Sequence, residues 1–205
     1  NQASTHIQND AYGQALLSLA LPFLKGKEET KDLDVFHQLC DKIQEIFDQA
    51  DAGLWEFRGR AQLHTYTYLF HWLGGQTAKK LGLKFSDPSL TQKGESLMKM
   101  ASEVIEKAYD EKREVYTQAI GVEALDASLL QMINWGYLHR KSDKAHKHLK
   151  AMEDNLGTLD GLMYRYKHAD DFGLPNTTFL ICGFWYVEAL ANLGYVEKAH
   201  SIFQT

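Results

Sequence analysis

The sequence is poor in cysteine and proline and has no excess of positive charge. Its 205 residues include two cysteines and three prolines, and its 27 acidic residues outnumber the 22 Lys and Arg. Cys40 and Cys182 lack the spacing of a metal or redox site and fall in apolar helical patterns. We therefore expect free thiols in a core and a cytoplasmic location. A net charge of −5 leaves no general basic surface, which argues against nucleic acid as a partner.

Several other sequence signals are missing. No apolar run reaches membrane-spanning length, and the start Asn-Gln-Ala-Ser-Thr-His resembles no signal peptide, so we expect no membrane partner. There is no Gly-rich phosphate loop and no nucleophilic Ser-His or Cys-His arrangement. His64 and His71 lack a third ligand for zinc. The sequence thus gives little support to phosphoryl transfer, acyl transfer or metal-dependent hydrolysis, and it indicates neither a metal nor a cofactor.

What the sequence has in abundance is helical periodicity, while strand patterns are nearly absent. Three stretches carry an apolar stripe on one face: Leu39–Phe47 (after Asp32 or Asp34 as a cap), Leu97–Ala108, and Ala145–Leu156, which Gly157 ends. Four others are apolar on nearly every face, as in helices packed on both sides: 9–24, 64–82, 126–139 and 177–193.

This alternation predicts about eight helices, paired as inner and outer members of one layered, toroid-like domain. The connections 51–63, 110–125 and 158–176 are long and carry aromatic and charged residues. Because long connections in a compact helical domain are usually functional, we expect the chemistry in these loops. Trp72, Trp135 and Trp185 lie within helical patterns and are predicted to be core residues.

The most informative loop is 51–59, where Glu56 lies between Trp55 and Arg58 in a turn bounded by glycines. Burial against an aromatic ring favours the neutral form of a carboxyl group, whereas a nearby guanidinium favours its charged form. The turn therefore has the parts needed to tune a proton donor. The alternative is a glutamate that only solvates the surface.

Three further loop residues have two interpretations each. Asp10 is either an N-cap or a contact to a sugar hydroxyl. His64 is either a core histidine or a hydrogen-bond donor to a ligand. Arg165, between two tyrosines, suits a hydroxyl-rich ligand, and it can also form an ion pair with Asp171 that orders its loop. Two other polar features favour a structural role: Asp126 as a helix N-cap, and His146 with His148 as a solvated face.

At these loops the sequence resembles glycoside hydrolase family 15, the glucoamylase-like family that includes glucodextranase and microbial trehalases. The similarity keeps family order across essentially the whole chain. The segments that carry it are His6–Gly13, Asp51–Arg58, His64–Trp72, Leu125–Leu130, Tyr164–Gly173 and Thr177–Leu190.

The resemblance implies an all-α fold, the (α/α)6 barrel, and hydrolysis of α-glucosidic bonds with inversion by an acid and a base. Glu56 takes the position of the general acid, and Trp55 that of a residue lining the subsite for the non-reducing sugar. Arg165 aligns with an arginine that hydrogen-bonds this sugar. Asp10, Arg58 and His64 fall in loops that face the pocket. The expected partner is an oligosaccharide or disaccharide with α-linked glucose.

The sequence also departs from the family pattern. The Trp-x-Arg-Asp motif, which lies upstream in the family, is missing. The resemblance implies that the general base belongs to a Glu/Asp-rich loop after the helix that ends near Phe203, and residues 1–205 are expected to stop short of that loop. Roughly eight of twelve helices are present, so residues 1–205 are expected to form part of one catalytic domain, inactive by itself. Two alternatives stay open: a trehalase or α-1,6-glucan hydrolase of the same family, and a non-catalytic helical carbohydrate-binding or scaffold protein.

Overall fold

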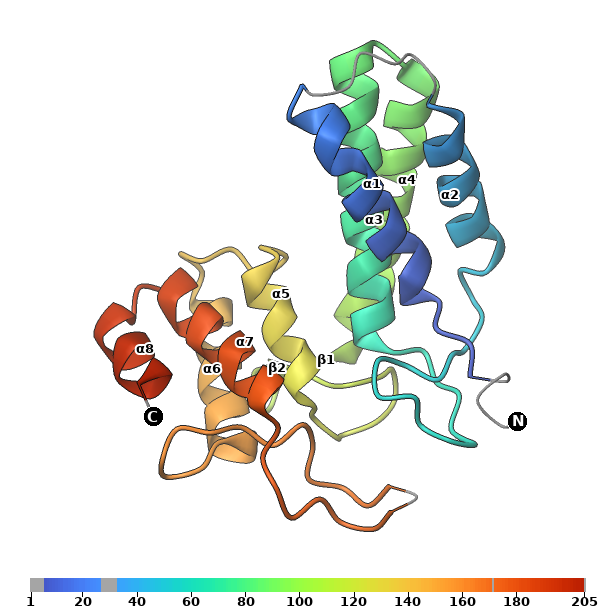
Figure 1. The fold of residues 1–205 in the computed structure, drawn as a ribbon. Helices are drawn as coiled ribbons and strands as arrows, with labels where there is room; N and C mark the ends of the chain where they lie inside the picture. Colours follow the sequence, from blue (N-terminus) through green and yellow to red (C-terminus); the bar gives the residue numbers. More distant parts are fainter. Residues whose placement is uncertain (1–5, 27–32, 171, 205) are drawn as a thin grey trace. The chain divides into compact units, whose positions relative to one another are not determined.

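A computed structural model describes residues 6–26, 33–170 and 172–204, and these are mostly helical (Figure 1). The chain divides into two compact units, the first ending at Ile105 and the second beginning at Glu106. The single domain expected over residues 1–205 stays a prediction. None of the described helices is long and apolar enough to cross a membrane.

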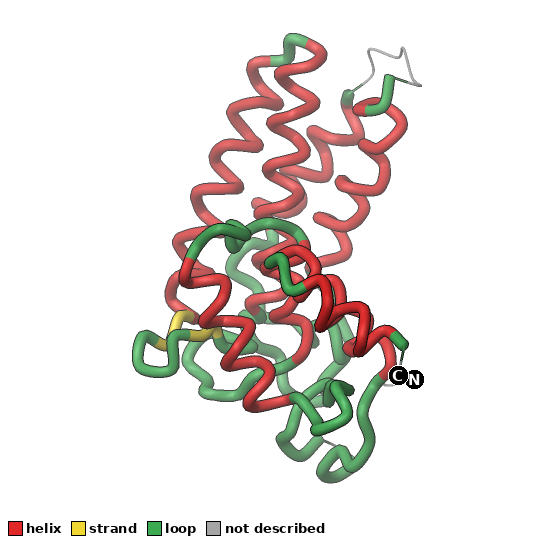
Figure 2. Tube along the Cα trace, turned by 90° about the vertical axis from the view of Figure 1, so that its left-hand side faces the viewer, coloured by secondary structure: helices red, strands yellow, loops and turns green. Residues whose placement is uncertain are grey.

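In its described residues the first unit contains four helices. They run side by side in the ribbon and in the tube view (Figures 1 and 2). They connect through loops at the two ends of the unit, and one of these loops carries the Glu56 turn. The helices are α1 (Asp10–Leu24), α2 (Asp34–Glu45), α3 (Thr65–Phe85) and α4 (Pro88–Ile105).

The longest described helix of the second unit has 14 residues, against 21 in the first, and loops make up much of this unit (Figure 2). A small antiparallel hairpin pairs Tyr109 with Tyr116 and Asp110 with Val115. Its elements are the 3-10 turn η2 (Glu106–Ala108), β1 (Tyr109–Asp110), β2 (Val115–Tyr116), the 3-10 turn η3 (Ala127–Leu130), α5 (Gln131–Asn134), α6 (Asp143–Leu156), α7 (Leu180–Asn192) and α8 (Val196–Phe203).

Helix α3 forms the centre of the first unit, with α1 and α4 packed against it. Fourteen of its 21 residues are buried, as predicted for a helix that is apolar on nearly every face. It approaches α4 closely where two glycines meet. A β-carbon at Gly75 would lie 2.7 Å from the Gly94 carbonyl oxygen, and one at Gly94 would lie 2.5 Å from the Gly75 carbonyl oxygen. Glycine is therefore required on both helices at this crossing.

The three predicted amphipathic helices are confirmed as α2, α4 and α6, but the predicted cap of α2 is wrong. Leu33 occupies its N-cap position and Asp34 is its first residue, while Asp32 lies outside the described residues. Helix α6 begins after Ser142, whose side chain accepts a hydrogen bond from the amide of Ala145, and it ends at Gly157 as predicted.

The predicted helix 126–139 is shorter than expected. Asp126 does cap it, accepting a hydrogen bond from the amide of Ser128 (2.9 Å), but one 3-10 turn follows and α5 ends at Asn134. Gly136 then takes a φ of +75°, which turns the backbone out of the helix. Trp135, predicted to be core, is consequently 44% exposed.

The solvated face predicted for His146 and His148 is wrong for His148, which is fully buried. Its Nε2–H donates to the carbonyl of Leu129 (3.1 Å), and its Nδ1 accepts from the amide of Tyr116 (3.3 Å). Burial lowers the pKa of His148 to about 4, so the ring is neutral at pH 7. Cys40 and Cys182 are buried free thiols, as expected.

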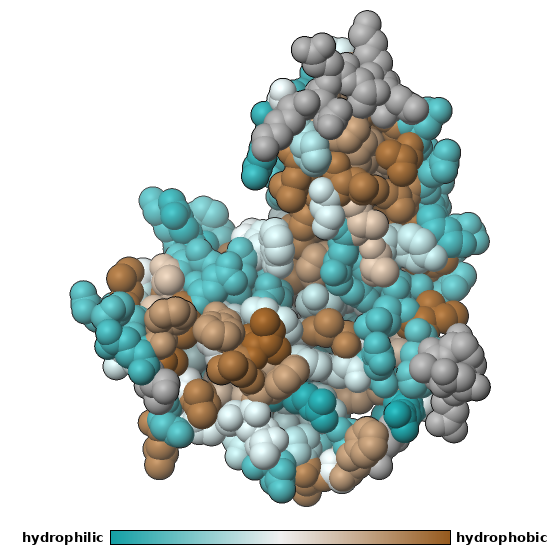
Figure 3. Space-filling model, viewed as in Figure 1, coloured by the Kyte–Doolittle hydropathy of each residue, from teal (hydrophilic) through white to brown (hydrophobic). Residues whose placement is uncertain are grey.

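Apolar side chains also reach the surface (Figure 3). In α1, Leu19 and Leu21 are exposed, and in α7 Leu180, Ile181 and Phe184 are exposed.

Candidate active site

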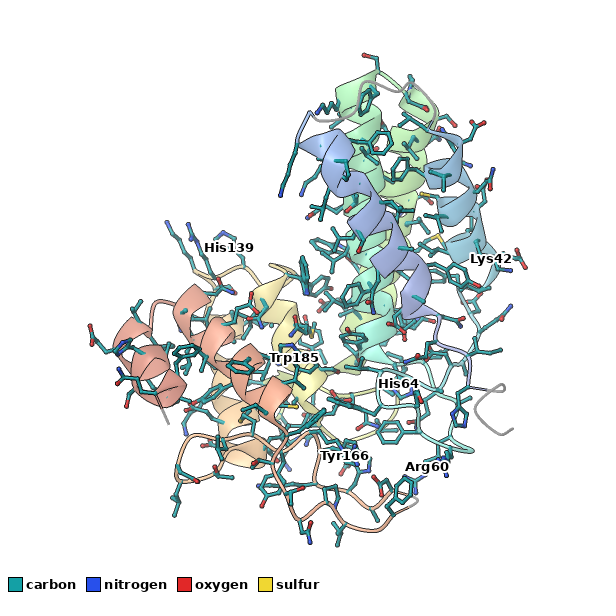
Figure 4. The ribbon with its side chains drawn as sticks, viewed as in Figure 1. Lys42, Arg60, His64, His139, Tyr166 and Trp185 are labelled. Atoms are coloured by element: carbon teal, nitrogen blue, oxygen red, sulfur yellow. The ribbon has the colours of Figure 1, made fainter. Side chains whose placement is uncertain are left out.

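The turn that carries Glu56 is closed by backbone hydrogen bonds at the start of α3. Asp51 and Gln62 form an antiparallel bridge, with N–O distances of 3.0 and 2.9 Å. The amide of Ala52 donates to the carbonyl of Ile7 (2.8 Å), which ties the turn to the segment before α1. Figure 4 shows His64 where α3 begins and Arg60 farther out on the loop. The sequence prediction of an ordered, Gly-bounded turn fits this geometry.

Glu56 is solvent-exposed and has a φ of +53°, in the left-handed region that few residues other than glycine adopt. The flanking glycines also have positive φ, +66° at Gly53 and +65° at Gly59. In the same turn Trp55 is half-buried and Arg58 is exposed. The carboxylate is accessible to a ligand, and its backbone is held in an unusual conformation of the kind that clusters at functional sites.

Asp51, at the head of the same motif, is a residue that the sequence reasoning missed. Its side chain is buried, with the residue only 2% exposed. One carboxylate oxygen accepts from the amide of Asn9 (2.8 Å) and from the hydroxyl of Thr67 (2.9 Å), and the other accepts from the amide of Gly53 (3.2 Å). The signal available in the sequence was its position directly before the Gly-bounded turn.

Asp10 is also buried, and its predicted capping role is wrong. It is the first residue of α1, with Asn9 at the N-cap position, and one of its oxygens accepts from the side chain of Gln14. The other oxygen has no hydrogen-bond partner in the structure. Burial, and then the nearby charge of Asp51, raises the pKa of Asp10 to about 6. Its role toward a sugar stays a prediction.

His64 lies at the N-cap position of α3 with its ring buried. The ring stacks on Phe57, with the centroids 6.0 Å apart and the planes at 20°. On α3, His71 is buried too and its Nε2–H donates to the carbonyl of Asn9 (3.2 Å). Among the described residues, no group of three or more His, Cys, Asp and Glu side chains suits a metal ion. The packing of His64 is that of a core residue, and its contact with a ligand stays a prediction.

Arg165 belongs to the second unit, where it pairs with Asp170. The predicted partner, Asp171, lies outside the described residues. Its Nη2 donates to the Asp170 carboxylate (2.9 Å), which also accepts from the hydroxyl of Tyr166 (2.6 Å). The guanidinium carbon lies 4.7 Å from the centroid of the Tyr166 ring. The hydrogen bond from Tyr166, ahead of the charge of Arg165, lowers the pKa of Asp170.

Arg165 and Asp170 border a hollow of about 260 Å³ on the second unit. Phe172 offers an exposed aromatic ring, and the side chains of Asn176, Thr177 and Thr178 offer hydrogen-bonding groups. An aromatic ring beside hydroxyl and amide groups suits a ligand with both apolar and hydroxyl faces. The structure therefore presents two candidate surfaces, the Glu56 turn on the first unit and the Arg165 hollow on the second.

A family comparison decides the class of protein. The family model described as glycosyl hydrolases family 15 matches residues 1–204. The chain belongs to glycosyl hydrolase family 15.

Similar proteins in this family are trehalases. The chain is 32% identical to the trehalase of Mycobacterium tuberculosis over 97% of its length and 24% identical to that of Thermoplasma volcanium over 100%. It spans 30% and 33% of those two proteins, respectively.

Solved structures confirm the predicted family-15 helical fold. A glycosidase variant in complex with glucose matches 98% of this chain with a TM-score of 0.80 at 18% identity, and the match covers 53% of that glycosidase. A bacterial glucoamylase complexed with acarbose matches 95% of the chain with a TM-score of 0.60 at 15% identity, and 36% of the glucoamylase is covered.

Proposed function

We propose that the protein hydrolyses α-glucosidic bonds by an inverting mechanism, with Glu56 as the general acid. The observation that supports this most is the conformation of Glu56: an exposed carboxylate, held at φ +53° beside Trp55, in a chain of glycosyl hydrolase family 15. In an inverting hydrolase, one carboxyl group protonates the leaving oxygen while a second activates water on the opposite face of the sugar.

The other site residues take supporting roles in this proposal. Trp55 lines the subsite for the non-reducing sugar, and Arg165 donates hydrogen bonds to that sugar. Arg58, Asp10 and His64 are proposed to lie in loops that face the sugar pocket. Arg165 is suited to its role because Asp170 and the Tyr166 ring fix its guanidinium group in one orientation.

Trehalose is the first disaccharide to test, because curated relatives of the chain are named trehalases. Maltooligosaccharides and α-1,6-linked glucans follow, because one structural neighbour is a glucoamylase. Within these 205 residues we assign no general base, and the chain spans about a third of its curated relatives. We therefore expect the 205-residue chain by itself to release no glucose.

The test is glucose release by the intact natural protein from trehalose, maltose, isomaltose, panose and maltooligosaccharides, with Glu56→Gln as the matched variant. Glutamine keeps the shape of the side chain but donates no acidic proton, so turnover should fall at least ~100-fold. Turnover near the parent value would show that the acid is another residue. Sugar binding without hydrolysis, unchanged in Glu56→Gln, would instead identify a binding protein.

A further inference from the structure

The buried carboxylate of Asp51 joins three segments of the first unit. Asn9, 42 residues away, contributes its amide from the start of α1, and Thr67 contributes its hydroxyl from the first turn of α3. The third donor is the amide of Gly53, within the turn itself. Three donors converge on an acceptor that water hardly reaches, so the carboxylate is fixed in position.

From Asp51 a short chain of hydrogen bonds leads to Glu56. The Gly53 amide donates to Asp51, and the Gly53 carbonyl accepts from the amide of Glu56 (3.1 Å). The same carbonyl also accepts from the side chain of Gln8 (3.1 Å), so two donors hold it in place. Gly53 is therefore held at both its N–H and its C=O, which belong to the two peptide groups on either side of its α-carbon.

This chain bears directly on Glu56 because its backbone is in the left-handed region. Such a conformation persists only where the surrounding hydrogen bonds determine it. If Gly53 changed its backbone conformation and its carbonyl turned away, the amide of Glu56 would lose its acceptor, and the Glu56 side chain would point elsewhere. A small displacement of an acid from the oxygen that it protonates is enough to lower the rate of the chemical step.

We propose that Asp51 is a positioning residue for Glu56: through Gly53 it holds the turn in the conformation that directs the acid to the leaving oxygen. This inference rests on the proposed function. It assigns Asp51 no contact with the substrate, and it makes the negative charge of Asp51 essential. An amide in its place would direct an NH₂ group either at the amide of Gly53 or at that of Asn9, and both are donors.

The test uses the intact natural protein and two substrates that differ in their need for an acid. One is the α-glucoside that the protein hydrolyses best, whose leaving sugar must be protonated. The other is α-glucosyl fluoride, whose fluoride leaves without a proton. Glu56→Gln defines the pattern that loss of the acid produces, and thermal unfolding of each variant monitors the fold.

Asp51→Asn should lower kcat on the glucoside by at least ~10-fold with KM within about twofold, because the acid is displaced while the sugar pocket is not. Hydrolysis of α-glucosyl fluoride should stay within about threefold of the parent rate. Thr67→Val, which removes one of the three donors, should show the same selectivity in milder form, and Thr67→Ser should restore the parent behaviour. This pair decides the question if Asp51→Asn does not fold.

Equal losses on both substrates would show that Asp51 serves only the fold, and unchanged turnover on the glucoside would show that it does not position the acid. Either result overturns the inference while leaving the proposed function intact. A different pattern marks failure of the function itself: the intact protein hydrolyses neither substrate, or Glu56→Gln keeps full turnover on the glucoside. The inference then fails with it.

Discussion

Gly53 lies directly against the imidazole ring of His64: a β-carbon at this glycine would be 2.7 Å from both Cδ2 and Nε2 of that ring. The turn that carries Glu56 thus packs against His64, the residue directly before α3. No side chain fits between Gly53 and the His64 ring. Because Gly53 also has a φ of +66°, two independent constraints require glycine here.

These constraints can be separated with a second glycine. Gly59 has nearly the same φ, +65°, but nothing lies within 4 Å of a β-carbon there. Gly59→Ala should therefore destabilise the protein by roughly 1 kcal/mol, from the left-handed backbone alone. Gly53→Ala should cost about 1–3 kcal/mol more, because the methyl group must displace the buried ring. Urea unfolding of both variants measures the difference, and equal free energies would contradict the contact with His64.

The crossing of α3 and α4 gives a second prediction. Gly75→Ala should destabilise the protein by roughly 2 kcal/mol or more, because its methyl group would lie 2.7 Å from the Gly94 carbonyl and force the helices apart. Gly183→Ala in α7 is the matched control, since a β-carbon there meets nothing within 4 Å. Alanine is the better helix former by up to about 1 kcal/mol, so this control should be neutral or stabilising. Melting temperatures that fall equally in both would refute the close crossing.

The third prediction concerns the dependence of stability on pH. The folded state raises the pKa of Asp10 from 3.8 to about 6, so it binds more protons than the unfolded chain between these values. Asp10 therefore lowers the free energy of unfolding as pH rises from about 4 to 6. His71 acts oppositely: burial lowers its pKa from 6.5 to about 4, so its contribution to stability grows as pH rises through that range.

In the parent protein these two contributions oppose each other, and Asp10→Asn removes one of them. The variant should gain stability as pH rises from 4.5 to 6.5, and at pH 7 it should exceed the parent by up to roughly 3 kcal/mol. Asp48→Asn, at an exposed site in the same unit, is the control. The measurement is urea unfolding at several pH values. If Asp10→Asn showed the same dependence of stability on pH as the parent, ionised Asp10 would not destabilise the folded state.

A fourth prediction tests the orientation of Arg165. Asp170→Asn weakens the hydrogen bonds from the guanidinium and from Tyr166, leaving Arg165 free to adopt other rotamers. If Arg165 contacts the sugar in the ground state and the transition state alike, KM should rise about 10-fold with kcat little changed. Asp160→Asn, on an exposed part of the same loop, should leave both constants unchanged. If Asp170→Asn kept the parent KM, the prediction that Arg165 binds the substrate would be wrong.

Much of the fold could be predicted because local patterns determine it. The apolar periodicity located α1, α3 and α7, and Gly157 and Asp126 marked helix ends through their own backbone preferences. The buried state of His148 was also within reach of the pattern. It falls between Ala145, Leu149 and Met152, on the same stripe of α6 that faces the core.

Other features depend on contacts between distant residues, which no local pattern contains. Asp51 is buried only because Asn9 and Thr67 supply donors from other segments. The pairing of Arg165 with Asp170 is likewise accompanied by a hydrogen bond from Tyr166, which shares the same carboxylate. Trp135 was assigned to the core because its helix was expected to continue, and the turn at Gly136 ends that helix.

Because most of α3 is buried, we expect its backbone amides and those of the Glu56 turn to exchange with deuterium at different rates. Backbone amides in its buried stretch are shielded on both sides by α1 and α4, so they exchange with deuterium only when the whole unit unfolds. The turn around Glu56 is held by a few hydrogen bonds at the edge of this helix, and its amides exchange through local openings that leave α3 intact. The acid thus lies on a turn whose amides exchange sooner than those of the buried helix that follows it.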